Sequence, residues 1–192
     1  QIVKFSQTGI EFIEYQVATN RMFKKPGEYD FAFIDRDIRR ILHLHPEAKL
    51  FVSVRFDLFS NWLEANPDEL IGYATGASDA DGDLERKRAP SMASKLFRKE
   101  LQHFTTAFVQ YLSQQEWFKR TVALRVSHAV YSEWHYYGMS QDMPDTGKAM
   151  TMAFRQWLKN NYATDKQLQL SWNDQLVTLD TAQVPNAQER RG

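Results

Sequence analysis

The chain has 192 residues, enough for one hydrophobic core of ordinary size, so we expect a single domain over residues 1–192, or a fragment of a larger one. Lysine and arginine number 24, as do aspartate and glutamate, and this zero formal net charge gives no long-range attraction to nucleic acids or anionic membranes. There is no cysteine, which excludes disulfides, thiolate nucleophiles and cysteine-ligated metal centres. No apolar run approaches the roughly 20 residues of a membrane span.

The first third of the chain alternates between element types. Residues Gly9–Val17 predict a strand or a short helix, and Lys25–Glu28 predict a turn. Apolar residues then recur at helical spacing over 33–42, and Pro46 would end that helix. Residues 50–56 are largely apolar, which predicts a strand buried on both faces.

Residues 72–90 are polar and predict a loop or insertion. A helix is expected over 95–112, followed by a buried strand over 122–134. Residues 152–162 show the spacing of a second amphipathic helix. Residues 164–167 are typical of a capping box that opens a short helix through Trp172.

This alternation of strands and helices predicts an α/β fold, with a parallel sheet covered by helices. The sequence alone does not separate an open doubly wound sheet from a closed barrel. No glycine-rich phosphate loop follows a predicted strand, which argues against a nucleotide-binding open sheet.

Glu133 is the main candidate for catalysis, because it stands at the end of an apolar predicted strand. Burying an unpaired carboxylate in such a strand costs free energy, because the charge loses its hydration. Proteins usually accept this cost at functional sites, such as strand ends that face a pocket. Trp134 beside it offers a flat apolar face on which a sugar ring could stack. The alternative is a structural carboxylate paired with an arginine.

Arg55 and Asp57 end another predicted strand, so both could lie on the same rim as Glu133. In the functional interpretation, Asp57 binds substrate hydroxyl groups and Arg55 pairs with a carboxylate. The alternative is a structural bridge between the two that holds the loop.

Aromatic residues on loops supply the other binding candidates: Trp62, Trp134, His135, Tyr136 and Tyr137, of which Trp62, Trp134 and Tyr137 are our choices for substrate contacts. Trp157 and Trp172 stand in helical patterns, so we expect both in the core. His128 stands inside the predicted strand, where a buried structural histidine is expected rather than a catalytic one.

The acidic segment Asp79–Glu85 invites a calcium-loop interpretation, but its glycine is in the fourth position, not the sixth that an EF-hand requires. A solvated acidic loop is the default. We therefore predict no metal and no cofactor.

Several segments together resemble the catalytic barrel of glycoside hydrolase family 42, the β-galactosidase-like members of the retaining glycosidase clan. The matching segments, in order, are Gly27–Phe31 with Ile34 and Asp35, His45–Leu50, Asn61–Leu70, Ser91–Ser94, Ser132–Trp134, Ala153–Leu158 and Leu168–Trp172.

The resemblance implies a partial (β/α)8 TIM-type barrel, roughly its first four strand–helix units. It implies hydrolysis of β-galactoside-like bonds by a retaining mechanism, with Glu133 as the acid/base at the end of the fourth strand. The family's nucleophilic glutamate belongs to the seventh strand, so this chain alone is expected to be inactive. Ser132 departs from the family's usual asparagine, which binds the sugar 2-hydroxyl.

The expected partner is a carbohydrate, as in a bacterial polysaccharide-degrading hydrolase, with neither a nucleic acid nor a membrane. The competing hypothesis is a non-catalytic carbohydrate-binding or interaction module on a degenerate or truncated barrel. A half barrel would expose sheet edges, so a homo-oligomer or the remaining half of the barrel is expected to cover them. Because the chain begins with Gln1, we interpret it as a processed or excised piece of a longer protein. The sequence does not determine the cellular compartment, and a periplasmic or secreted location is possible.

Overall fold

The computed structural model describes residues 2–18, 21–56, 60–74, 88–128, 132–136 and 143–191. The chain divides into two compact units. Unit 1 comprises residues 1–58 and 99–134, and unit 2 comprises residues 59–98 and 135–192. The division falls within one helix, after Arg98. A single domain over the whole chain stays a prediction.

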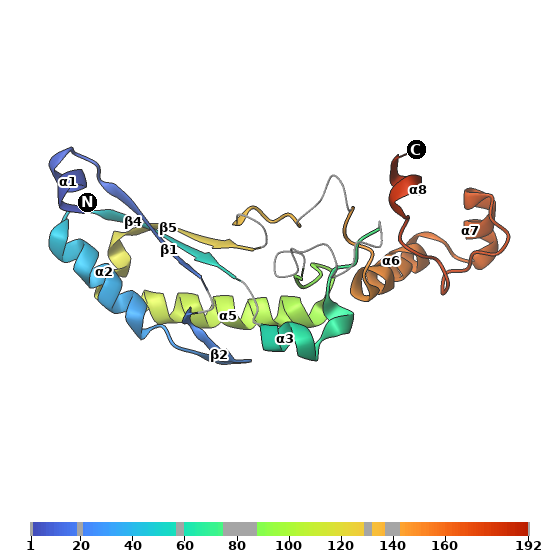
Figure 1. The fold of residues 1–192 in the computed structure, drawn as a ribbon, viewed down its shortest axis with the longest axis horizontal. Coiled ribbons are helices and arrows are strands. Elements are labelled where there is room, and N and C mark those ends of the chain that lie inside the picture. The colour runs from blue at the N-terminus through green and yellow to red at the C-terminus, as the bar shows by residue number, and fades with distance from the viewer. Residues whose placement is uncertain are drawn as a thin grey trace. The chain divides into compact units, whose positions relative to one another are not determined.

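A parallel sheet forms the centre of unit 1 (Figure 1). Its strands are β1 (Phe12–Ala18), β4 (Lys49–Arg55) and β5 (Thr121–Ser127), with β4 in the middle. The expected α/β class with a parallel sheet is confirmed. The described residues hold three such strands rather than the four strand–helix units expected.

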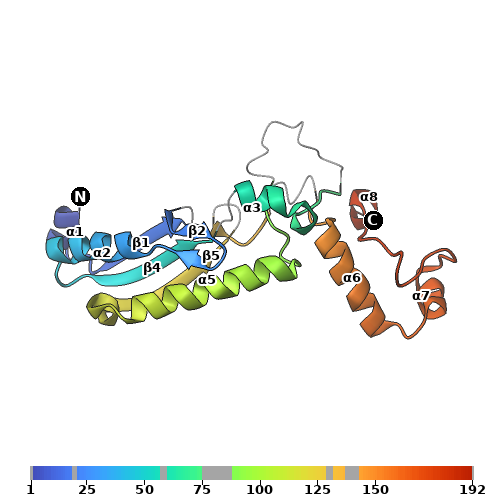
Figure 2. The same cartoon turned by 90° about the horizontal axis from the view of Figure 1, so that it is seen from below.

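Strand β4 is buried as expected, because it has a hydrogen-bonded neighbour on each side. Leu50, Val52 and Val54 are inaccessible to solvent. Helices α2 (Ala32–Leu44) and α5 (Lys95–Ser113) run along the sheet (Figure 2). Both were predicted from helical spacing, and α2 ends two residues before Pro46.

The aromatic core of unit 1 centres on Phe104 of α5. Its ring lies 5.0 Å from that of Phe56 and 5.6 Å from that of Phe108, measured between centroids. Tyr29 and Phe31 contact the same ring. Tyr29 is the last residue of the β2–β3 hairpin (Phe23–Lys25 and Glu28–Tyr29), and Phe31 follows it. The turn of this hairpin was predicted and contains Gly27 at φ +78°.

Strand β5 differs from its prediction in two ways. It ends at Ser127 instead of continuing through residue 134, and most of it is exposed, with Val122 at 55%. The expectation of a buried strand there is therefore wrong. An edge strand has only one neighbour in the sheet, and its apolar composition alone does not reveal that position.

The remaining elements are short apart from α6. Unit 1 also contains α1 (Ile2–Gln7) and η4 (Glu116–Arg120). Unit 2 contains α3 (Ser60–Ala65), η2 (Pro67–Glu69), α6 (Lys148–Asn161), α7 (Asp165–Trp172) and α8 (Ala187–Arg191). Among the described helices, none has the length and apolar character of a membrane span.

The predicted cap of α7 by Thr164 is confirmed, and the return bond from Gln167 reaches Ala163, one residue before the cap. Thr164 Oγ1 accepts a hydrogen bond from the Gln167 backbone N–H, and Gln167 Oε1 accepts one from the N–H of Ala163. The expectation that Trp157 and Trp172 are core residues is wrong, because Trp157 is 55% exposed and Trp172 is also exposed. Their helices bury other positions, such as Leu158 and Leu168.

The predicted loop over 72–90 is described only at its ends. The N–H of Ile71 donates to the carbonyl of Ala89, and Leu70 forms an antiparallel bridge with Pro90. The acidic segment weighed as a calcium loop lies outside the described residues. In the part of the chain that is described, no three His, Asp or Glu residues gather in a metal-binding cluster.

Candidate active site

The carboxyl ends of the three parallel strands lie level at one edge of the sheet. Ala18 is in register with Arg55, and Arg55 with Ser127. The N–H of Phe56 then donates to the carbonyl of Ser127 at 2.7 Å, which extends the pairing by one residue. Active sites of parallel α/β folds form at this edge, because the loops that follow the strands meet there.

His128 anchors the loop that leaves β5. Its side chain is 1% exposed, and Nδ1 lies 2.6 Å from the carbonyl oxygen of Phe56. A carbonyl only accepts hydrogen bonds, so Nδ1 carries the proton in this contact. The expectation of a buried, hydrogen-bonded histidine is confirmed.

Glu133 lies in a tight turn six residues after the end of β5. Ser132 and Trp134 on either side of it have φ of +66° and +59°. These are left-handed conformations that cost a residue with a side chain on the order of 1–2 kcal/mol, and they concentrate at functional sites. The Glu133 side chain is exposed, so solvent reaches its carboxyl group.

Two contacts hold this turn in place. The N–H of Trp134 donates to the carbonyl of His128 at 3.0 Å. Gln16 Nε2, on β1, donates to Ser132 Oγ at 3.4 Å. The Trp134 indole meets the His128 ring edge-on and remains 44% exposed, so much of its surface is available to a ligand.

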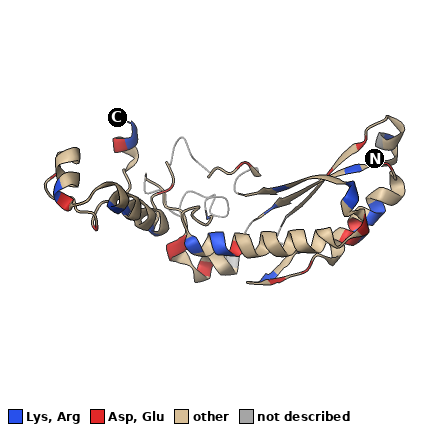
Figure 3. Ribbon diagram, turned by 180° about the vertical axis from the view of Figure 1, so that it is seen from behind, with Lys and Arg blue, Asp and Glu red and all other residues tan. Residues whose placement is uncertain are grey.

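One face of the sheet carries a polar network that links all three strands. Arg125 on β5 donates from Nε to Ser53 Oγ on β4 at 3.0 Å. Its Nη2 lies 3.4 Å from Glu14 Oε1 on β1. Figure 3 shows basic and acidic positions on these strands. Our sequence reasoning missed Glu14 and Arg125, although Glu14 and Gln16 are two residues apart, as are Arg125 and Ser127, a spacing that places each pair on one face of its strand.

The structure describes two of the other four predicted site residues, Arg55 and Trp62. Arg55, the last residue of β4, is partly exposed at the carboxyl edge. Trp62 lies on α3 in unit 2 and is 6% exposed, so its indole offers little surface to a ligand. Asp57 and Tyr137 lie outside the described residues.

Tyr136, just beyond the turn, belongs to unit 2 and is partly buried. Its hydroxyl oxygen accepts a hydrogen bond from the Met92 N–H. Burial raises the pKa of Tyr136 above its usual range. Tyr136 is therefore held in its neutral form against the backbone of Met92.

Comparisons with known proteins give a consistent result. The family model of glycoside hydrolase family 42, described as beta-galactosidase, matches residues 1–178. Among solved structures, the beta-galactosidase from the psychrophilic Marinomonas ef1 matches with a TM-score of 0.68 at 20% identity. That match covers 96% of this chain and 28% of that chain. No curated protein matches significantly.

The structural likeness shows a shared fold, and the family match extends over most of the sequence. The chain spans 28% of the length of the Marinomonas enzyme. Its expected resemblance is thereby confirmed: the chain belongs to glycoside hydrolase family 42, the beta-galactosidase family.

Proposed function

We propose that this chain supplies the acid/base part of a retaining glycosidase site that acts on β-galactoside-like substrates. The observation that carries the proposal is the position of Glu133. It is exposed between two left-handed residues, in the segment that follows the parallel strand β5, in a family 42 chain. Two left-handed residues in one turn cost conformational free energy, and such strained turns are concentrated at active sites and ligand-binding sites.

In the first chemical step, the carboxylic acid of Glu133 donates its proton to the glycosidic oxygen as the bond from that oxygen to the anomeric carbon breaks. A second carboxylate attacks the anomeric carbon and forms a glycosyl ester. In the second step, the Glu133 carboxylate takes a proton from water. The water oxygen attacks the anomeric carbon as the ester bond breaks and releases the nucleophilic carboxylate. The sugar leaves with its anomeric configuration retained.

The nucleophilic carboxylate is assigned by the family resemblance to a later strand than those described. It has to lie about 5–5.5 Å from Glu133 for a retaining mechanism. The chain's own contribution is therefore proton transfer and substrate contact, and activity of the 192 residues alone is not part of the proposal.

Substrate contacts are proposed for Trp134 and Arg55. The exposed indole of Trp134 offers a surface for the apolar face of a sugar ring, and Arg55 stands at the carboxyl edge where hydroxyl groups would lie. Asp57, Trp62 and Tyr137 remain in the proposal on sequence grounds. Of these, Trp62 would have to turn outward to stack on a sugar.

The test is hydrolysis of galactosides by the protein at its full natural length, with Glu133→Gln as the variant. Removing a general acid should lower turnover of substrates with a poor leaving group by about 10²–10⁴-fold. Substrates with an activated leaving group need no protonation, and azide should accelerate their turnover and give a galactosyl azide of retained configuration. Glu47→Gln, which changes an exposed glutamate before the amino end of β4, is the matched control.

Unchanged turnover in Glu133→Gln would reject the acid/base role. Equal losses in Glu133→Gln and Glu47→Gln would reject a specific role as well.

A non-catalytic carbohydrate-binding module is the second candidate, and Ser132 favours it. The family's usual asparagine at this position binds a substrate hydroxyl, and the serine here instead accepts a hydrogen bond from Gln16. Galactoside binding by the full-length protein without any hydrolysis would support this candidate and overturn the first.

A further inference from the structure

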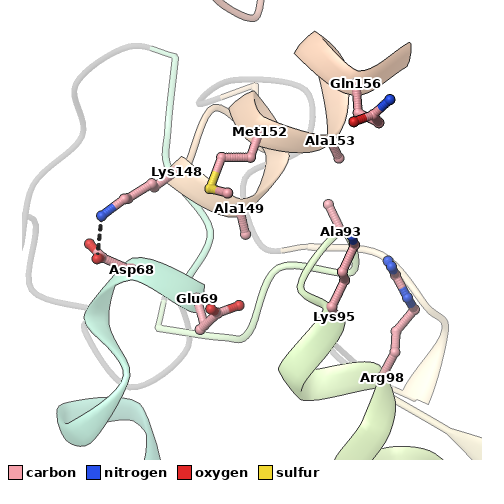
Figure 4. Close-up of a pocket in the computed structure, with 10 residues that line it drawn as sticks. All are labelled: Asp68, Glu69, Ala93, Lys95, Arg98, Lys148, Ala149, Met152, Ala153 and Gln156. Atoms are coloured by element: carbon pink, nitrogen blue, oxygen red, sulfur yellow. Dashed lines mark hydrogen bonds and ion pairs between the residues drawn. The ribbon is translucent and has the colours of Figure 1, made fainter. Parts of the chain in front are cut away.

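Unit 2 contains a pocket of about 580 Å³ between η2, the beginning of α5 and the first turns of α6 (Figure 4). This volume lies in the range of small-molecule sites. The described residues that line it all belong to unit 2, whereas Glu133 belongs to unit 1. We therefore treat this pocket separately from the candidate active site.

The two acidic residues of the pocket already have partners. Asp68 pairs with the ammonium group of Lys148, and Glu69 accepts a hydrogen bond from the Ser94 hydroxyl. Of the three cationic side chains among the described lining residues, Lys148 is therefore already paired.

Two cations remain for a ligand, Lys95 and Arg98. Arg98 donates from Nη1 to the carbonyl of Met92 at 2.7 Å, which leaves its other guanidinium donors. For neither residue does the described part of the chain record a carboxylate partner. The lining therefore favours an anionic group at this end of the pocket.

Lys95 and Arg98 are three residues apart on α5, so they lie on the same side of the helix, one turn apart. Figure 3 shows basic positions gathered on these first turns. An ammonium and a guanidinium at this spacing can contact one carboxylate together, and a guanidinium binds a carboxylate with two parallel hydrogen bonds.

The facing wall belongs to α6 and is apolar. Ala149, Met152 and Ala153 follow the spacing of one helix face, and the thioether of Met152 extends into the pocket (Figure 4). Gln156, one turn further along, adds a neutral amide that can donate and accept hydrogen bonds. An apolar wall beside an amide suits a pyranose ring, which has an apolar C–H face and a hydroxylated rim.

We propose that this pocket binds a carboxylate-bearing sugar, a uronate, with its carboxylate on Lys95 and Arg98 and its ring against the α6 wall. The assignment of the ligand as a sugar rests on the proposed function, because the family is carbohydrate-active. The assignment of a carboxylate on that ligand rests only on Lys95 and Arg98 and does not depend on the catalytic proposal.

The test is calorimetric titration of the chain with three probes: digalacturonate, the corresponding neutral galactose disaccharide and acetate. Digalacturonate should bind at least tenfold more tightly than either of the others, because only it offers both the charge and the ring. Lys95→Met and Arg98→Gln should each weaken its binding about tenfold, the value of one charge-assisted hydrogen bond. Lys99→Met, next on the same helix and outside the pocket, is the matched control and should bind normally.

The proposal would be overturned by no binding of digalacturonate, by equal affinity for the neutral disaccharide, or by equal affinity for acetate. Equal losses in Lys95→Met and Lys99→Met would overturn it too. Lys95 is exposed, so its variant should remain folded even if Arg98→Gln does not, and far-ultraviolet circular dichroism checks both. Glu133→Gln should leave digalacturonate binding unchanged, so failure of the catalytic proposal and failure of this one give different results.

Discussion

The backbone N–H of Trp134 donates a hydrogen bond to the carbonyl oxygen of His128, and this bond closes the chain on itself around Glu133. His128 is in turn fixed to β4 through the carbonyl of Phe56. The turn that presents Glu133 is thereby tied to the central strand of the sheet. A carboxyl group on a turn so anchored keeps its position relative to the strand ends, as proton transfer in a fixed geometry requires.

Ser132→Asn should stabilise the turn. Asparagine tolerates the left-handed conformation better than serine, so we expect a gain of about 0.5 kcal/mol in the free energy of unfolding. If the glycosidase proposal is correct, kcat/KM for galactosides should also rise, because the amide restores the family's contact to the 2-hydroxyl. Urea unfolding and galactoside kinetics measure the two effects. Ser132→Ala, which has no group to accept from Gln16, should show neither gain, and a gain with alanine would contradict both explanations.

His128→Phe should destabilise unit 1. Phenylalanine fills a similar volume but removes the donor to the Phe56 carbonyl, and the loss of a buried hydrogen bond costs about 1–3 kcal/mol. Chemical unfolding of the variant gives the value. His103→Phe, at an exposed position of α5, is the control and should stay within about 0.5 kcal/mol. Equal effects of the two substitutions would show that the buried hydrogen bond is not the cause.

Asp35 should make the stability of unit 1 depend on pH. Burial tends to raise its pKa, but hydrogen bonds from Arg39 and Trp117 outweigh burial and hold the pKa below its usual range. A carboxyl group whose folded pKa is lowered stabilises the protein above its unfolded pKa, and that contribution is lost as the pH falls through the folded pKa. Asp35→Asn should therefore cost about 1–2 kcal/mol at neutral pH, and this difference should disappear as the pH falls into the acid range.

Thermal unfolding over a pH series measures this effect. Trp117→Phe removes only the indole donor, 2.8 Å from Asp35 Oδ1, and should reduce the same pH dependence in part. A difference between Asp35→Asn and wild type that stays constant down to pH 2 would contradict the explanation.

The sequence predicted those elements whose signals are local. The spacing of Ile34, Ile38 and Ile41 defined α2, and Thr164 with Gln167 defined the start of α7. These patterns depend on neighbours three or four residues away, which a sequence displays directly.

Burial in strands and helices was harder to predict, because it depends on distant segments. Val122 and Trp157 belong to apolar patterns that are typical of buried elements, yet both are exposed. Whether a strand lies at an edge, or whether a helix face is covered, depends on which other segments pack there. The network of Glu14 with Arg125 shows the same limit, since its partners are more than a hundred residues apart.

Phe104→Ala should severely destabilise unit 1. The Phe104 ring is fully buried among four aromatic side chains, and removing such a ring costs about 3–5 kcal/mol through lost transfer energy and the cavity that remains. Urea unfolding monitored by tryptophan fluorescence gives the change. Val109→Ala, at an exposed position of the same helix, should cost less than about 0.5 kcal/mol. A small effect of Phe104→Ala would mean that the aromatic cluster does not form the core of the unit.

The open edges of the sheet predict self-association or pairing with further barrel segments. Among the described strands, β1 and β5 each have one neighbour, so each presents a row of backbone groups that another strand can bind. Val122 adds an exposed apolar side chain to the β5 edge. Val122→Lys should therefore shift the sedimentation of the 192-residue chain toward monomer, because a lysine on an edge strand opposes pairing.

Leu176→Lys, at an exposed apolar position in unit 2, is the control and should leave association unchanged. A wild-type chain that stays monomeric at about 100 μM would contradict the prediction, and an equal effect of the two lysines would place the contact elsewhere than β5.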